Sequence, residues 1–266
     1  MELFVGFEGS TARRRLTGIL ERWEANGDRR SAFLGTWVSC TDAVLVAMHN
    51  GRFANPAWVL ALLDDLAGHY LITIEPEDDV LLHVTPPAWR AAHDVAASRT
   101  ATRHEALILG VNAVINNDLP QAVCNALLAD WPLNNIGLER RHQDLCLVLD
   151  IVSAAMDGGE CAAVDLETRT RLAHLVDAWR DEMWQNAVAM VTAVDERWRD
   201  LIRESIEHTA LRRAHLIMCD IVAGSHLLEM PGHRLDYVFP PRHRPDACRL
   251  SVALPVWGGS ARATTP

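Results

Sequence analysis

GVNAVINNDLP, residues Gly110–Pro120, lies inside a long apolar helical pattern and decides how the rest of the chain is interpreted. The segment carries three asparagines and one aspartate within seven residues. A polar group buried in a helix costs free energy unless it finds a hydrogen-bond partner. So dense a run indicates either a demanding joint between helices or the wall of a polar pocket, and it shows where a functional site is to be sought.

Apolar residues recur at helical spacing on both sides of this segment. Pro120 is expected to interrupt or restart the central helix, because proline lacks the amide hydrogen that a helix interior needs. Helices are predicted at residues 11–25, 31–49, 55–71, 85–97, 102–117, 136–156, 165–206 (one or two helices) and 207–229. The sequence therefore predicts an all-α fold, a single-domain multi-helix bundle over residues 1–230.

The helical pattern ends after Pro231. Residues 231–266 are rich in proline and glycine, which predicts an irregular C-terminal tail that packs on the domain or is partly disordered. Within it, residues 252–256 have the weak pattern of a strand.

Composition excludes several classes of partner. The net charge is −10 and the pI is about 5.6, which disfavours nucleic acid and anionic membranes because both attract basic surfaces. No run of about 18 uncharged apolar residues is present, so no membrane span is predicted. The N-terminus lacks the charge order of a secretory signal, and the six cysteines form no CxxC pair. A reduced, cytoplasmic protein is expected.

The order of several motifs resembles a known family. The motifs are Phe33 to Thr41, Gly51-x-Phe53, Asn55-Pro56-x-Trp58, Asp65, Tyr70, Pro87-Ala88-Trp89, Gly110 to Pro120, and Asp144. Together they resemble the bacterial domain-of-unknown-function family 5995 over about residues 30–155. In that family the central motif usually reads Leu-Gly-x-Asn-Ala-His-Ile-Asn-x-Asp-Leu, and the histidine position is Val114 here. The resemblance implies an α-helical fold and the location of a pocket, but no reaction. If the family's histidine is a ligand or a proton carrier, this chain has lost or moved that chemistry.

Helical geometry divides the polar residues of the central segment into two faces. Asn112 and Asn116 are four residues apart and are expected to share one face, while Val114 and Asp118 share another. The structural alternative is that Asp118 caps a new helix, with Gln121 as its reciprocal partner. Asn116 and Asn117 would then satisfy the carbonyls at the end of the preceding helix.

Three further carboxylates are candidates for a site. Asp64-Asp65 is similar to the start of a Mg²⁺-binding helix, but the third acid is missing, and a solvated acidic face is favoured. Asp144 is four residues after Arg140 on the same predicted helix, and a surface ion pair between the two is enough to explain this spacing. Asp150 lies in an apolar run; a carboxylate facing the core would have a raised pKa and serve as a general acid, unless it points to solvent or pairs with an arginine.

The last predicted helix carries a stripe of His208, Arg212, His215, Cys219 and His226. His215-x-x-x-Cys219 mirrors His142-x-x-x-Cys146, and two such pairs facing each other would supply four zinc ligands. That spacing is no known zinc signature, so core cysteines and histidines at the edge of a pocket are favoured, and no metal or cofactor is predicted.

The leading hypothesis is an enzyme of small-molecule, specialised metabolism that binds an apolar substrate between helices. Asp118 and Asp150 would be catalytic in a metal-free cyclisation, isomerisation or elimination of lyase or isomerase type. The substrate-binding candidates are Asn112, Asn116, Asn117, Asp65, Val114, Asp144 and His215. One alternative is a non-catalytic binding or scaffold protein with a degenerate site. Another is metal-dependent chemistry, with Mg²⁺ and an isoprenyl diphosphate or Zn²⁺ in hydrolysis. A homodimer is compatible with any of them.

Overall fold

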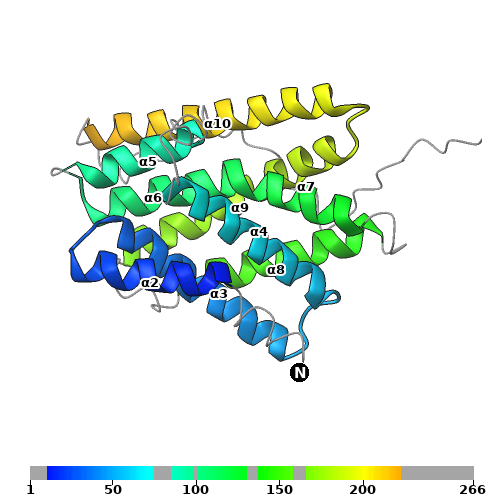
Figure 1. Ribbon diagram of the computed structural model, residues 1–266, viewed down its shortest axis with the longest axis horizontal. Helices are drawn as coiled ribbons and strands as arrows, with labels where there is room; N and C mark the ends of the chain where they lie inside the picture. The colour runs from blue at the N-terminus through cyan, green and yellow to red at the C-terminus, as the bar shows by residue number, and fades with distance from the viewer. Residues whose placement is uncertain (1–10, 75–84, 99–100, 131–136, 158–165, 223–266) are drawn as a thin grey trace, which may run out of the picture. The chain divides into compact units, whose positions relative to one another are not determined.

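Figure 1 shows the computed structural model, which describes residues 11–74, 85–98, 101–130, 137–157 and 166–222. Within these ranges the regular structure consists of α-helices and one π-helical turn, with no strand. The prediction of an all-α fold is therefore confirmed. The predicted C-terminal tail, including its weak strand, lies outside the described residues.

The helices follow one another closely along the chain. Their bounds are α2 Thr11–Ala25, α3 Arg30–His49, α4 Pro56–Ile74, α5 Pro87–Ala97, α6 Arg103–Ala113, η2 Val114–Asp118 (the π-helical turn), α7 Leu119–Asp130, α8 Leu138–Asp157, α9 Leu166–Val191 and α10 Glu196–Val222. From α2 to α5 and in α8 these bounds agree with the predicted ranges to within three residues.

Side-chain caps fix where two of these helices begin. Asn55 Oδ1 accepts a hydrogen bond from the backbone N–H of Trp58 at 3.1 Å, so the predicted cap of α4 is confirmed. At α6, the Thr102 side chain accepts from the Glu105 N–H, and the Glu105 carboxylate accepts from the Thr102 N–H. This reciprocal pair is a capping box, and it satisfies two amide donors that a helix start leaves open.

The boundary between the last two helices was predicted wrongly. A boundary was expected after residue 206, with one or two helices before it, whereas α9 ends at Val191 and α10 runs unbroken from Glu196 to Val222. Asp195 Oδ1 accepts a hydrogen bond from the Trp198 N–H at 2.9 Å and caps the start of α10. No glycine or proline marks this break, so the apolar periodicity appeared to continue across it.

The central helix continues through Pro120, contrary to the prediction that proline would interrupt it. The backbone N–H of Leu119 bonds to the carbonyl of Val114, five residues back, which is the hydrogen bond of a π-helix. Pro120 follows directly as the second residue of α7, where the wider turn accommodates the missing amide. The segment α6–η2–α7 is therefore one helix with a π-helical turn in its middle.

This central helix is surrounded by the other helices (Figure 1). It contacts α3, α4, α5, α9 and α10, and its π-helical turn alone contacts α4, α9 and α10. The residues from Gly110 to Pro120 are accordingly buried, apart from the half-buried Val114. The segment from Gly110 to Pro120 thus lies in the core of the bundle.

Gly110 allows α3 to approach the central helix closely. A Cβ atom at this position would lie 2.5 Å from Cδ2 and 2.6 Å from Cγ of Phe33. The Phe33 ring cannot easily move away, because it packs against the rings of Trp37, Tyr70 and Trp89 at centroid distances of 5.3 to 5.7 Å. Only glycine fits this crossing without displacing the aromatic cluster.

Gly110→Ala is therefore expected to lower the free energy of unfolding by about 1–3 kcal/mol, the usual cost of overpacking, in a urea titration. Gly68→Ala in α4 is the matched control, since an added Cβ there meets nothing within 4 Å. Alanine's better helix propensity should make that variant more stable by up to about 1 kcal/mol. Equal stability of the two variants would contradict the close contact.

Two helices, α3 and α4, are long and apolar enough to cross a membrane by length and composition alone. The buried share of their apolar windows is 56% and 50%, and they contact α8 and α7 respectively. Core helices of a globular bundle meet the same criterion. The absence of a membrane span stays a prediction.

Candidate functional site

The polar residues of the central helix lie in the core. Asn112 and Asn117 are fully buried, Asp118 is 1% exposed and Asn116 is 5% exposed. Asn116 Nδ2 donates to Asn112 Oδ1 at 3.0 Å, which confirms that these two side chains share a face. π-Helical turns occur frequently at functional sites. The segment combines that geometry with four buried polar side chains.

A hydrogen-bond network extends from one side of this helix to α9 and α10. Asn112 Nδ2 donates to the carbonyl of Ala210 at 3.0 Å. Arg213, 6% exposed, donates to Asn116 Oδ1 at 2.5 Å and to Glu182 Oε2 at 2.7 Å. Asn112, Asn116 and Arg213 therefore join the central helix to α9 and α10.

Asp118 lies on another side of the helix, facing α5. Its Oδ2 accepts from the indole N–H of Trp89 at 2.7 Å, and its Oδ1 accepts from Asn117 Nδ2 at 2.8 Å. Burial raises the pKa of Asp118 to about 6, although the charge of His69 and these two hydrogen bonds act to lower it. The carboxyl therefore titrates close to neutral pH, as a general acid or base does.

Two residues of α4 lie close enough to act on this carboxyl. The charges of His69 and Asp65 shift the pKa of Asp118 in opposite directions, with His69 lowering it and Asp65 raising it. His69 Nε2 lies 3.7 Å from Asp65 Oδ2, which also accepts from Asn125 Nδ2 of α7 at 3.0 Å. The structure thus groups Asp65 with Asp118, and it adds His69, which the sequence analysis did not select.

Asp118 does not cap a helix, so that alternative is wrong. Gln121 Nε2 donates to the backbone carbonyl of Asn117 at 2.9 Å and not to Asp118. The chain is already helical at Asp118, so no open amide donors need a cap there. Asn117 Oδ1 is buried and has no hydrogen-bond partner within the described part of the chain.

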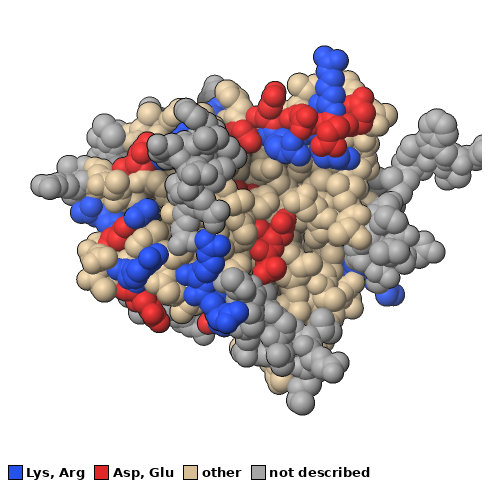
Figure 2. Space-filling view, in the orientation of Figure 1, with Lys and Arg blue, Asp and Glu red and all other residues tan. Residues whose placement is uncertain are grey.

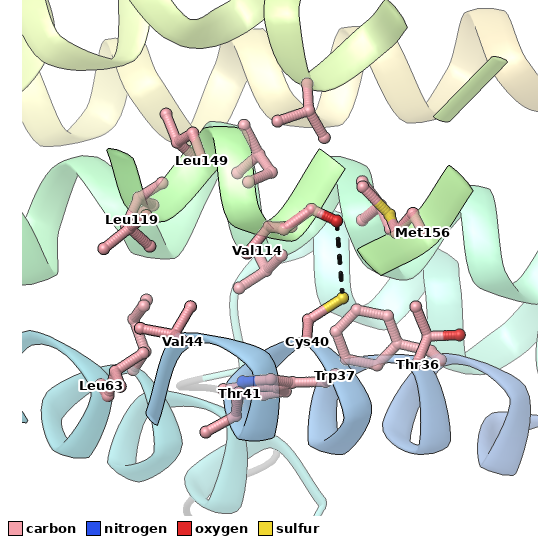
Figure 3. A pocket seen from close by; sticks show the side chains of 17 residues that line it. Thr36, Trp37, Cys40, Thr41, Val44, Leu63, Val114, Leu119, Leu149 and Met156 are labelled. Atoms are coloured by element: carbon pink, nitrogen blue, oxygen red, sulfur yellow. Dashed lines mark hydrogen bonds between the residues drawn. The ribbon is translucent and has the colours of Figure 1, made fainter. Parts of the chain in front are cut away.

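An apolar cavity of about 90 Å³ lies on a third side of the central helix, among α3, α4, α8, α9 and the π-helical turn. Figure 3 shows its wall, where α3 contributes Thr36, Trp37, Cys40, Thr41 and Val44. The thiol of Cys40 is directed across the cavity toward the Val152 carbonyl, 3.9 Å away. A hollow of about 20 Å³ shares Trp37, Thr41 and Leu63 with the cavity and extends to Arg13 of α2.

Val114 and Leu119 of the central helix face this cavity, whereas Asp118 does not line it. The prediction that Val114 and Asp118 share a face is therefore wrong. The π-helical turn brings together residues five apart, so Leu119 takes the place that Asp118 would have in an α-helix. The position at which the resembling family has histidine thus opens on an apolar cavity.

The other predicted site residues lie apart from this region. Asp144 is buried, and its oxygens accept from the backbone N–H groups of Ala54 and Asn55, both at 2.8 Å. It therefore anchors the start of α4 and forms no surface pair with Arg140. Asp150 points to solvent and pairs with Arg180 at 2.6 Å, because its neighbours Leu149 and Ile151 take the inward positions. The alternative that Asp150 points to solvent and pairs with an arginine is therefore confirmed, and a core-facing Asp150 is wrong.

His215 and Cys219 are exposed on α10, while His142 of α8 stacks on Trp184 at a centroid distance of 4.5 Å. The two His-x-x-x-Cys pairs therefore do not face each other. Among the described residues, no group of three or more His, Cys, Asp or Glu side chains is placed to hold a metal ion.

Sequence reasoning missed Trp89, Arg213 and the cavity wall formed by α3. Trp89 was noted only as part of a motif, although its indole N–H is one of the few donors on an apolar helix. Arg213 had the signal of a charged residue between the apolar Ala210 and Ala214, and that signal could have been used. No sequence signal marks a cavity, which arises where side chains of several helices fail to fill the space between them.

Comparison with known protein families identifies the family to which the chain belongs. Its model is described as a family of unknown function and matches residues 10–219, well beyond the 30–155 range of the resemblance. No curated protein and no solved structure matches the chain. Because the match covers most of its length, the chain belongs to the family of unknown function DUF5995.

Proposed function

We propose that the protein binds a small apolar ligand in the cavity beside the π-helical turn. The observation that carries this proposal is the lining: seventeen residues from α3, α4, the central helix, α8 and α9 surround the space, and nearly all of them are apolar. Natural cores leave few voids larger than a water molecule, because each unfilled volume costs packing energy. An apolar hollow of this size, beside a segment that buries four polar side chains, is therefore better explained by an occupant than by imperfect packing.

The volume limits what the occupant can be. At about 90 Å³, the cavity is smaller than the ~150 Å³ apolar cavity that accepts benzene in an engineered protein. Pockets for drug-sized ligands occupy roughly 300–1,000 Å³. A whole isoprenyl chain would therefore not fit inside the cavity. Because the cavity is partly open, it still admits a single small ring or the end of a hydrocarbon chain, either as a whole ligand or as the apolar end of a larger one.

The test is a thermal unfolding series with benzene and with xenon under pressure. A ligand that binds only the folded state raises the melting temperature in proportion to its occupancy. Val114→Phe should place a ring in the cavity and abolish the rise in melting temperature. Val46→Phe is the control, because Val46 of α3 is 59% exposed and does not line the cavity, and this variant should keep the rise. A rise that survives Val114→Phe would place binding elsewhere.

We propose acid–base catalysis at Asp118 as the second candidate function. It is supported by the carboxyl's pKa near 6 and by the neighbouring His69 and Asp65, which are half-buried at the surface of α4. A metal-free isomerisation or elimination in cytoplasmic small-molecule metabolism needs such a group. Asp118 does not line the cavity, so a substrate would have to approach it from the α4–α7 side.

The two candidate functions are separable by one pair of variants. Asp118→Asn should abolish turnover of an identified substrate while leaving the benzene-induced rise in melting temperature intact. If the two regions act independently, Val114→Phe should abolish the benzene-induced rise in melting temperature and leave turnover intact. Unchanged turnover in Asp118→Asn would eliminate acid–base catalysis by this carboxyl.

A further inference from the structure

Helix α10 presents an exposed stripe along its whole length. Its members are Trp198, Leu201, Ser205, His208, Arg212, His215 and Cys219, spaced alternately by three and four residues, and all are exposed. The opposite face carries the buried Ile206, Ala210, Arg213 and Ala214. This is the spacing of the contact seam in a two-helix coiled coil. In Figure 1, α10 runs along the top of the described bundle, and no labelled helix lies above it.

The apolar members of this face stand toward its two ends. Trp198 is 55% exposed and Leu201 47% exposed near the start of α10, and Leu216 is 40% exposed near its end. Val194, in the turn that precedes the helix, is 86% exposed. Polar residues occupy the middle. When two copies of such a helix lie antiparallel, the apolar end of each therefore lies against an apolar end of the other.

The charges of α10 also favour an antiparallel pairing of two copies. Near its start, Glu196 pairs with Arg199 and Asp200 pairs with Arg203 within the helix. Figure 2 shows side chains of both charges close together at the upper right, where Figure 1 places the start of α10. Glu204 and Arg212, by contrast, form no ion pair with any residue in the part of the chain that the structure describes. They lie eight residues apart on the exposed side of α10, one of each sign.

We propose that the α10 stripe is the contact surface of a homodimer in which the α10 helices of two copies pair antiparallel. A two-fold axis near Ser205 and His208 places Arg212 of each copy beside Leu201 and Glu204 of the other. The same axis places Trp198 against His215 and Leu216 of the second copy. Parallel pairing would align Arg212 with Arg212 and separate it from Glu204, so like charges oppose that arrangement.

The interface is small and depends on charge. The stripe from Trp198 to Cys219 covers 21 residue steps, or about 32 Å of helix. Its centre is polar, whereas tight coiled coils keep apolar residues at these positions. We therefore expect a dimer that forms in the micromolar range and weakens as salt screens the pairs between Glu204 and Arg212.

The test is a charge-swap cycle followed by sedimentation of the full-length chain at concentrations up to about 1 mM. Glu204→Arg and Arg212→Glu should each raise the dissociation constant by tenfold or more, because each sets like charges against each other across the axis. The double variant restores opposite charges and should return within about threefold of the wild type. Arg140→Glu on α8 changes the same charge on an exposed residue away from α10 and should have no effect.

Each result decides the proposal. A chain that stays monomeric throughout the concentration range would overturn it, as would a dimer that is insensitive to the single variants. A double variant no better than the single variants would show that Glu204 and Arg212 do not meet. Leu201→Asp is a second disrupting variant that does not involve these charges, and circular dichroism of every variant verifies that it is folded.

Discussion

Arg213→Met is expected to lower the free energy of unfolding by about 3 kcal/mol, the largest loss among the substitutions considered. Methionine is similar in length but donates no hydrogen bond, so the variant leaves the buried Asn116 Oδ1 without its donor. It also removes the guanidinium that lies 5.5 Å from the centre of the Trp179 ring. Glu182 contributes less to the loss, because its side chain is 43% exposed and water can solvate it.

A urea titration of Arg213→Met beside Arg140→Met measures this loss, since Arg140 is exposed and its change should stay within about 0.5 kcal/mol. Asn116→Leu/Arg213→Met completes a double-mutant cycle. The double variant should lose less free energy of unfolding than the two single variants together. Once both residues are replaced, Asn116 Oδ1 is no longer buried without the Arg213 donor, and the guanidinium no longer lacks this acceptor. Additive losses would mean that Arg213 and Asn116 do not act as a pair.

The stability that Asp118 contributes is expected to fall as pH rises through about 6. Its pKa in the folded state is about 6, whereas an unfolded aspartate titrates near 3.9. Between these values the folded chain holds a proton that the unfolded chain has lost, so acid favours the folded state. From pH 4.5 to pH 7.5 the ionisation of this buried carboxyl should cost about 2 kcal/mol.

Asp118→Asn isolates this contribution, because asparagine has nearly the same shape and does not titrate. As pH falls from 7.5 to 4.5, the free energy of unfolding of the wild type should rise by about 2 kcal/mol relative to that of Asp118→Asn. His69→Gln provides a second check: the charge of His69 lowers the pKa of Asp118, so its removal should move the transition to higher pH. A difference that stays constant with pH would contradict the raised pKa.

Local signals predicted most of the helices. The cap at Asn55, the prolines that precede α5 and the apolar periodicity of α3 and α8 are each encoded within a few neighbouring residues, and the structure agrees with them. The same reasoning failed at Pro120, where it assumed a 3.6-residue period. A π-helical turn forms because surrounding helices make the wider turn favourable, and a single segment of sequence does not contain that information.

The candidate site was predicted in its location but not in its arrangement. The dense polar run at Asn112 to Asp118 did indicate the centre of the fold, and Asp65 does lie near Asp118. The π-helical turn, however, directs the amide network toward α10, Asp118 toward α5 and Val114 into the cavity. Which partner each side chain meets depends on helices far apart in the sequence, such as α5 and α10, and could not be read from residue spacing.

The buried polar network and the apolar cavity thus lie on different sides of the central helix. The buried amides and Arg213 hold three helices together, so they explain why so polar a helix is stable in an apolar core. The volume that remains open lies on the apolar side, next to Val114 and Cys40. Binding in the cavity therefore does not require any of the buried polar groups to be released from its partner.

The most direct test of binding in the cavity is a methyl NMR titration of the protein with benzene. The lining supplies well-placed methyl reporters in Val114, Val148, Val152, Leu63 and Leu149, and the exposed Val46 and Val194 serve as internal controls. We predict saturable chemical-shift changes at the lining methyls and none at the two exposed valines. Unchanged lining methyls up to the solubility of benzene, or changes confined to the surface, would contradict the account.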